Sequence, residues 1–172
     1  MSTFGHGSMG SPVQEHRILV ANDMQWIDGN LQTRGTPHNF INQDDQEVFT
    51  IGEPYVAPWS FTGLPASRPG TLVAVSENIQ FLVLPDEETR SSFREAPRTA
   101  TVIFSLPLAV IRGNVPFLSE AQLPNFLEFY KGRFVPVTGA SIHYLAGCAG
   151  QLIPTADLLY VNRNLIQSYV QG

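Results

Sequence analysis

The sequence lacks most of the features that mark a secreted, membrane-bound or disulfide-stabilised protein. Its 172 residues contain one cysteine, Cys148, which excludes an internal disulfide framework. No apolar run approaches the ~20 residues of a membrane-spanning helix. The N-terminus also lacks the charged start and hydrophobic core of a signal peptide. We therefore expect a cytoplasmic protein with no membrane association.

Charge is also scarce, and it is unevenly distributed. Charged residues make up 15% of the chain and hydrophobic residues 43%, with a net charge of −5. Residues 16–84 contain seven acidic and three basic residues, whereas residues 98–172 contain three acidic and five basic residues. The acidic total disfavours a bulk attraction to nucleic acid. An acidic half joined to a mildly basic half favours head-to-tail self-association. Divergence after a duplication would also produce this difference in charge.

The residues that carry catalysis or bind metals form no recognised pattern. His143 and Cys148 are five positions apart and lack further ligands at a zinc spacing or a third group that would orient a nucleophile pair. The acidic residues of the first half lack the spacing of a calcium loop: Asp23, Asp28, Asp44, Asp45 and Glu47. The glycines follow no phosphate-loop spacing. We therefore predict a protein that is not an enzyme and has no cofactor or metal.

The sequence does contain an internal duplication. Residues 20–31 return as residues 104–115 at an offset of 84, and residues 39–41 and 72–79 return as 125–127 and 158–165 at an offset of 86. Repeats of this kind determine the architecture before any local prediction. Units of about 70 residues bury only about 60% of their unfolded surface, so each would gain from packing against the other.

Each unit is predicted to be a bent β-structure with one short helix. A glycine inside a strand pattern, Gly29 or Gly113, predicts a bulge or bend. A helix is expected after Thr36 in the first unit and after Pro124 in the second, and a closing hairpin turns at an asparagine in both. The expected organisation is a flexible arm at 1–15, a first unit at 16–85, a linker at 86–97 and a second unit at 98–172. The fold class is all-β with short helices, because five short, bent strands favour a small barrel.

Two motifs of each unit resemble the Sm-like small β-barrel. They are Ile27-Asp-Gly-Asn-Leu31 with Val75-Ser-Glu-Asn-Ile79, and Ile111-Arg-Gly-Asn-Val115 with Val161-Asn-Arg-Asn-Leu165. The whole unit also resembles a family of uncharacterised bacterial domains. The resemblance implies two tandem Sm-like five-stranded barrels. Sm-like proteins form rings by pairing the edges of their last two strands, and many bind RNA in the ring pore.

The Sm-like RNA-contacting positions differ in this chain. The Asp-and-Asn pairing expected after the bent strand is replaced by residues 33–35 and 117–119, and the Arg-Gly step of the closing hairpin is absent. Arg163 retains a positive charge there. We therefore expect a non-catalytic assembly or protein-interaction module that forms homo-oligomers through β-edges. The alternative is a single-stranded RNA-binding protein that uses Arg163 and Arg112.

Two groups of side chains are candidate contacts. The apolar loop at residues 58–65 has no counterpart in the second unit, and its Trp59, Phe61 and Leu64 either pack over the core or contact a partner. Tyr130 and Tyr160 lie near basic residues and could stack on bases, but core packing explains them as well.

Overall fold

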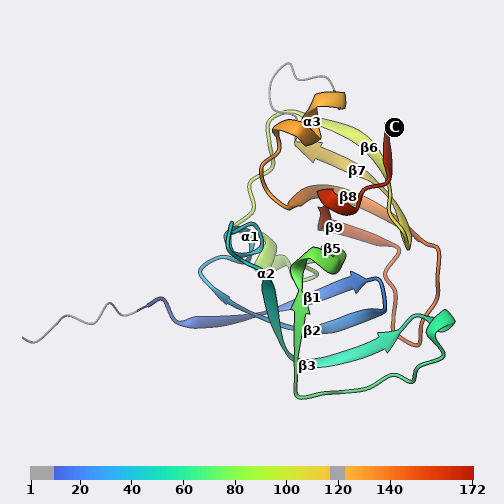
Figure 1. The fold of residues 1–172 in the computed structure, drawn as a ribbon. Coiled ribbons are helices and arrows are strands. Elements are labelled where there is room, and N and C mark those ends of the chain that lie inside the picture. The colour runs from blue at the N-terminus through green and yellow to red at the C-terminus, as the bar shows by residue number, and fades with distance from the viewer. Residues whose placement is uncertain (1–9, 117–122) are drawn as a thin grey trace, which may run out of the picture.

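The ten strands of the described residues form one antiparallel sheet (Figure 1). The computed structural model describes residues 10–116 and 123–172, so most of the predicted N-terminal arm and the loop at 117–119 lie outside the described residues. The all-β fold class with short helices is confirmed. No helix in the described part of the chain has the length and apolar character needed to cross a membrane.

The two halves contain the same succession of elements. The first half consists of β1 (Val13–Asn22), β2 (Gln25–Arg34), α1 (Pro37–Ile41), β3 (Val48–Pro58), β4 (Thr71–Val75) and β5 (Ile79–Val83). The second consists of β6 (Thr99–Ser105), β7 (Ala109–Pro116), α3 (Leu123–Phe129), β8 (Phe134–Tyr144), β9 (Thr155–Asn162) and β10 (Ser168–Gln171). Short helical turns are α2 (Glu87–Arg90), η1 (Ser60–Thr62), η2 (Ser76–Asn78) and η3 (Arg163–Leu165).

The strand order is β10-β6-β7-β8-β9-β5-β1-β2-β3-β4. In each half, the last strand lies beside the first, and the second, third and fourth follow in sequence. The halves are joined by β5 and β9, which pair through Phe81↔Val161, Leu82↔Tyr160 and Val83↔Leu159. The predicted pair of separate barrels is not confirmed, because this pairing makes one continuous sheet that no pairing among the described strands closes.

The bends predicted at the two glycines are confirmed. The register shifts next to Gly29 where β2 pairs with β3, and next to Gly113 where β7 pairs with β8. A Cβ atom on Gly29 would lie 2.5 Å from Ile51 Cγ2, and one on Gly113 would lie 2.4 Å from Val137 Cγ1. Both positions therefore require glycine because the bulged neighbouring strand approaches the backbone too closely for a side chain.

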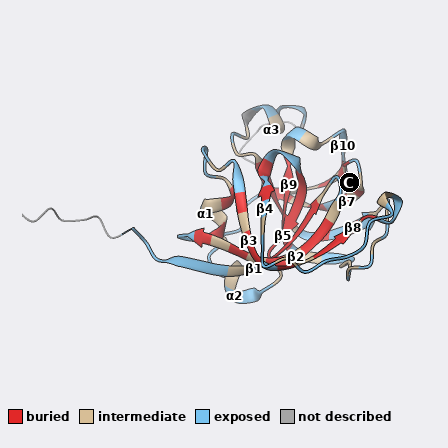
Figure 2. Ribbon diagram, turned by 60° about the horizontal axis from the view of Figure 1, so that its bottom comes forward, coloured by how far each residue is buried: buried red, intermediate tan, exposed pale blue. Residues whose placement is uncertain are grey.

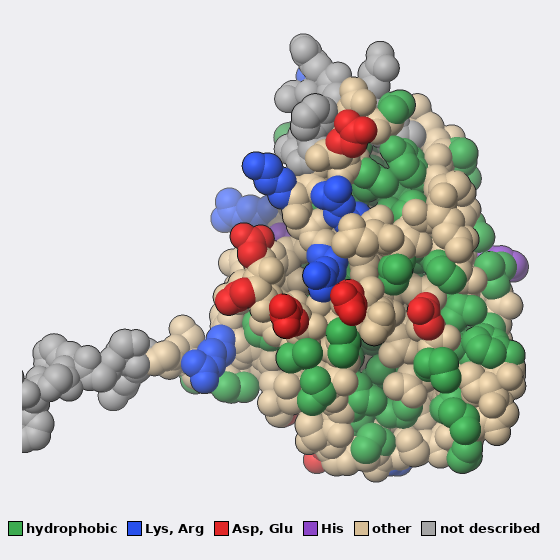
Figure 3. Space-filling model, viewed as in Figure 1, with side chains coloured by type: hydrophobic (Ala, Val, Ile, Leu, Met, Phe, Trp, Pro, Cys, Tyr) green, Lys and Arg blue, Asp and Glu red, His purple; other side chains and the backbone are tan. Residues whose placement is uncertain are grey.

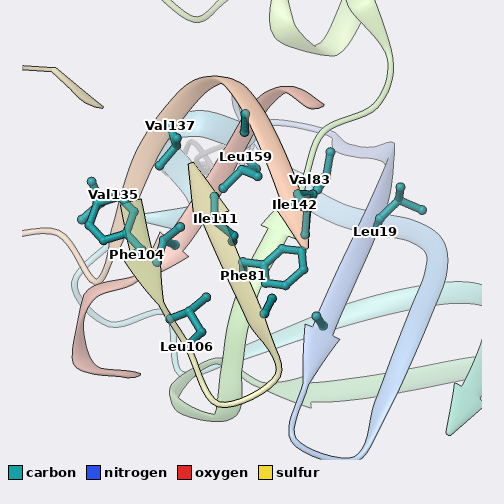
Figure 4. Close-up of a cluster of buried hydrophobic side chains, with 14 of the residues drawn as sticks. Leu19, Phe81, Val83, Phe104, Leu106, Ile111, Val135, Val137, Ile142 and Leu159 are labelled. Atoms are coloured by element: carbon teal, nitrogen blue, oxygen red, sulfur yellow. The ribbon is translucent and has the colours of Figure 1, made fainter. Parts of the chain in front are cut away.

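The central strands are buried on both faces. Along β9, Leu159 and Val161 belong to one hydrophobic cluster, while Leu158 and Tyr160 belong to a second cluster on the opposite face. All five residues of β5 are buried in the same two-sided way. Figure 2 shows these buried strands in the middle of the molecule, and Figure 4 shows side chains of both halves meeting in the first cluster. The two halves therefore share their cores.

The closing hairpins align at an offset of 87 residues, one more than the sequence comparison predicts. Thr138 takes the place of Gly52, because each pairs with the asparagine after the bend glycine, and β3 and β8 thus align at the predicted 86. Gly52 pairs with Thr71, whereas Thr138 pairs with Leu158, which lies 87 positions after Thr71. The predicted match of residues 72–79 with 158–165 is therefore wrong by one residue.

Candidate functional site

The apolar loop after β3 separates into a buried and an exposed part. Trp59 is only 1% exposed, its indole Nε1–H donates to Asn22 O at 2.8 Å, and its backbone forms an isolated bridge with Cys148 of the second half. Of the two alternatives for this loop, core packing therefore holds for Trp59, whose indole is enclosed in the core shared by the two halves.

Phe61 and Leu64 of the same loop remain at the surface. Their exposed fractions are 64% and 58%. The neighbouring Ser60 holds the loop against the second half, with its N–H and its hydroxyl both donating to Gly147 O at 2.8 Å. A partner contact through Phe61 and Leu64 stays a prediction.

The two arginines of the predicted RNA surface do not share a site. Arg112 is an exposed residue of β7 and pairs with Ser141. Arg163 begins η3, and its N–H donates to Arg133 O next to the start of β8. Ser141 lies eight residues along the chain from Arg133, which corresponds to roughly 25 Å of extended strand.

The stacking role considered for the two tyrosines is also limited by burial. Tyr160 is fully buried, and burial raises the pKa of its phenol. Tyr130 is half-buried, its hydroxyl donates to Phe134 O at 3.0 Å, and burial raises its pKa to about 12. Tyr160 is therefore a core residue with no face open to a base.

The junction between the halves contains a buried polar connection. Asn162, at the end of β9, is fully buried, and its Nδ2 amide donates to the carbonyl oxygens of Ser76, Glu77 and Ile79 at 3.5, 3.2 and 2.9 Å. Its Oδ1 accepts from the Asn164 N–H at 3.1 Å. The side chain therefore joins the end of β9 to the backbone of the η2 turn and of the start of β5.

A second polar clamp lies beside it. Asn42, which ends α1, donates from Nδ2 to Phe134 O and accepts at Oδ1 from the Phe134 N–H, both at 2.9 Å. These two bonds attach the helix of the first half to the start of β8 in the second. A pocket of about 220 Å³ opens next to this clamp.

His38 forms a third connection, between α1, the linker and β9. Its Nδ1 is hydrogen-bonded to the Tyr160 hydroxyl, and its ring lies edge-on to Phe93 with centroids 5.2 Å apart. Burial lowers the pKa of His38. The neutral imidazole is thus the form that the junction accommodates.

Stability is therefore expected to fall on mild acidification. The folded-state pKa of His38 is below the unfolded value, so protonation favours the unfolded chain, and the stabilisation present above about pH 6.5 is lost as the pH falls below it. Urea midpoints measured at about pH 7.5 and about pH 5.5 should differ less in His38→Gln than in the original chain.

His16 provides the comparison for this measurement. Burial also lowers its pKa, but the negative charge of Glu88 opposes that effect. An acid sensitivity that is unchanged in His38→Gln and removed in His16→Gln would contradict the role of His38.

The residues first considered for metals or nucleophilic chemistry are dispersed. His143 is exposed, and Cys148 is half-buried with a thiol whose pKa is raised by burial. Of the acidic residues, Asp28 pairs with Arg17 at 3.0 Å and Asp23 accepts from Gln80 at 2.6 Å. No group of three potential metal ligands occurs in the described ranges.

The sheet ends in two edge strands, β4 and β10. Val73 and Val75 of β4 are exposed, as is Val170 of β10. Edge strands present unpaired backbone groups on which another strand can add. The two edges thus expose apolar side chains beside backbone groups that no described strand pairs.

Sequence reasoning missed the junction pocket, although a signal for it was present. Lys131 and Arg133 line the pocket with Arg163. At an offset of 86, the corresponding residues of the first half are Asp45 and Glu47. The charge difference between the halves is therefore concentrated partly at this site, which the separate charge totals did not locate.

The chain was compared with protein-family models, curated proteins and solved structures, and none of the three comparisons found a match.

Proposed function

We propose that the protein is a non-catalytic assembly module that forms homo-oligomers by pairing β4 of one copy with β10 of the next. The observation that carries the proposal is the internal junction. There, the last strand of the first half pairs with the fourth strand of the second half. The free edges are the fourth strand of the first half and the last strand of the second, so the same pairing can be repeated between chains.

The exposed side chains at these edges support this proposal. Val73 of β4 is 58% exposed, whereas its counterpart in β9 at the offset of 87, Tyr160, is fully buried in the junction. Val170 of β10 is 57% exposed, whereas its counterpart Val83 is buried. Pairing between copies would bury apolar surface at positions where the internal junction already does so.

The internal register specifies the register expected between chains. Transferring the three β5–β9 pairs by 87 residues places Ser168 opposite Ala74, Tyr169 opposite Val73 and Val170 opposite Leu72 of a second copy. The resemblance to Sm-like proteins points the same way, because their rings form by pairing the last two strands. Three chains would then supply six units to a pseudo-ring.

The test is the mass in solution of an edge variant. Val73→Lys would place an unpaired ammonium group in the new junction, which should weaken association by at least about tenfold. Sedimentation velocity or light scattering should show a discrete oligomer for the original chain and a monomer for the variant.

Val13→Lys is the matched control. Val13 is also an exposed valine in a strand, but it pairs with Arg34 of β2 and does not belong to β4 or β10, so the oligomer should persist. A monomeric original chain at about 100 µM, where a micromolar assembly would be saturated, would contradict the proposal.

Single-stranded RNA binding remains a second candidate, and one observation favours it. Arg163 lies in the junction pocket with two other basic residues, whereas Arg112 is far from that pocket. Binding of an oligonucleotide should weaken with rising salt and with Arg163→Ala, but not with Arg112→Ala.

A further inference from the structure

The basic residues of the second half gather around the pocket at the junction. Lys131, Arg133 and Arg163 line it, and Asp44 is the only acidic residue among its lining residues. The chain as a whole has a net charge of −5. Figure 3 shows Lys and Arg side chains close together beside α1 and below α3, with acidic side chains mainly beneath them. The pocket is thus a local positive region in an acidic protein.

The folding of the scaffold does not require this positive charge. In the first half, the positions of Lys131 and Arg133 are occupied by Asp45 and Glu47, and the position of Arg163 by Ser76. The same backbone bond is made in both halves: Ser76 N–H donates to Glu47 O at 2.9 Å, and Arg163 N–H donates to Arg133 O at 2.9 Å. The same backbone hydrogen bond therefore forms with acidic and neutral residues at these positions. The cations occur only in the second half, where they line the junction pocket.

Two of the cations are held in place. Arg133 donates from Nη1 to the Ser76 hydroxyl, and Arg163 donates from Nη1 to the carbonyl oxygen of Tyr130. A guanidinium group has five N–H donors, so a single bond orients it and leaves donors for a ligand. The Asn42–Phe134 clamp fixes the pocket wall contributed by the first half. The positive groups are thus pre-organised before a ligand arrives.

The size and charge of the pocket define the ligand class. Three cations and one carboxylate leave a positive excess, and guanidinium groups match the oxygen geometry of phosphate. A volume of about 220 Å³ is below the range of drug-sized ligand pockets and suits one small anionic group. We propose that the junction pocket binds a phosphate group, carried either by a small free phosphate or by a nucleic acid. The proposal does not depend on self-association, because the pocket lies within one chain.

The test is a titration of the full chain with inorganic phosphate, AMP and a hexauridylate. Binding is measured by isothermal titration calorimetry and by the NMR chemical shifts of the backbone amides. Phosphate and AMP should bind competitively, and the shifts should concentrate at residues 41–46, 131–133 and 163–164. Lys131→Gln, a variant of an exposed residue, should weaken binding by about tenfold, and Asp44→Asn should tighten it, because each changes the local charge by one. Arg112→Gln changes the total charge equally and should leave the affinity unchanged.

The oligonucleotide identifies the source of the phosphate. Competition between the hexauridylate and phosphate would assign the pocket to nucleic acid, whereas binding of AMP and phosphate alone would assign it to small phosphates. The proposal is overturned if none of the three probes binds at about 10 mM, far weaker than physiological ligands, or if Arg112→Gln weakens binding as much as Lys131→Gln. It is equally overturned if Asp44→Asn leaves the affinity unchanged while the amide shifts lie outside the pocket.

Discussion

Trp59→Ala is expected to lower the free energy of unfolding by about 3–5 kcal/mol, as measured by urea denaturation followed by circular dichroism. The indole is fully buried and packs in the cluster that contains Phe81 and Trp26 of the first half and Phe104 of the second. Its removal leaves a cavity and also leaves the Asn22 carbonyl oxygen without the indole donor. The loss should therefore affect both halves in one cooperative transition.

Phe61→Ala is the matched control for this variant. Phe61 lies two residues further along the same loop and is mostly exposed, so its truncation should change the unfolding free energy by less than about 0.5 kcal/mol. A Trp59→Ala variant no less stable than Phe61→Ala would show that the indole does not connect the two halves.

Asn162→Ala is expected to cost about 3 kcal/mol. The substitution removes the side-chain donor to the carbonyl oxygens of Ser76 and Glu77 in η2 and of Ile79 at the start of β5, although Ser76 O keeps the backbone N–H of Ile79. Because these groups lie next to the β5–β9 pairing, amide exchange should accelerate first in the two strands that join the halves. The measurement combines urea denaturation with hydrogen exchange at Leu82 and Tyr160.

Asn164→Ala serves as the control for Asn162→Ala. Asn164 is an exposed residue of the same η3 turn and is expected to have little effect. Faster exchange confined to the free edge strands, with β5 and β9 unaffected, would argue against a role of Asn162 at the junction.

The sequence was sufficient for the all-β class, the bends and the first short helix, but not for the predicted barrels. Glycine placed inside a strand pattern predicted the bends, and these occur at Gly29 and Gly113 because a side chain there would collide with the bulged neighbour. The short helix α1 also begins as expected, with the Thr36 hydroxyl accepting from the Asn39 N–H and Pro37 in the first turn. These features depend on local sequence, which the duplication displays twice.

The pairing of the two halves could not be predicted from the sequence. Strand β9 reads as a continuous apolar run, since Leu158 and Leu159 face opposite clusters, and such a run gives no period-two signal to fix its register. The one-residue error in the hairpin alignment arose there. The pairing of β5 with β9 joins residues about 80 positions apart, and local pattern carries no information on that contact.

The candidate sites could not be predicted either, because they too depend on contacts between the halves. An apolar loop is compatible with burial or with a partner, and only the packing of the second half against it distinguishes Trp59 from Phe61. Likewise, the pocket combines the end of α1 and the segment after it with the loop before β8 and the η3 turn of the other half. Its cations are spread over more than 30 positions of the sequence, so they become a cluster only when the halves join.

The shared sheet also affects the order in which the protein can fold during synthesis. Strand β5 is apolar on both faces and acquires its second neighbour only when β9 has left the ribosome, roughly 75 residues later. At about 5–20 residues per second, this interval lasts several seconds. During that time a completed first half exposes the unpaired, apolar edge of β5. The charged linker that follows β5, with Glu87, Glu88 and Arg90, is the first segment to be translated in that interval. A nascent chain is thus most vulnerable to mispairing midway through translation, and slow decoding of residues 98–155 would prolong that exposure.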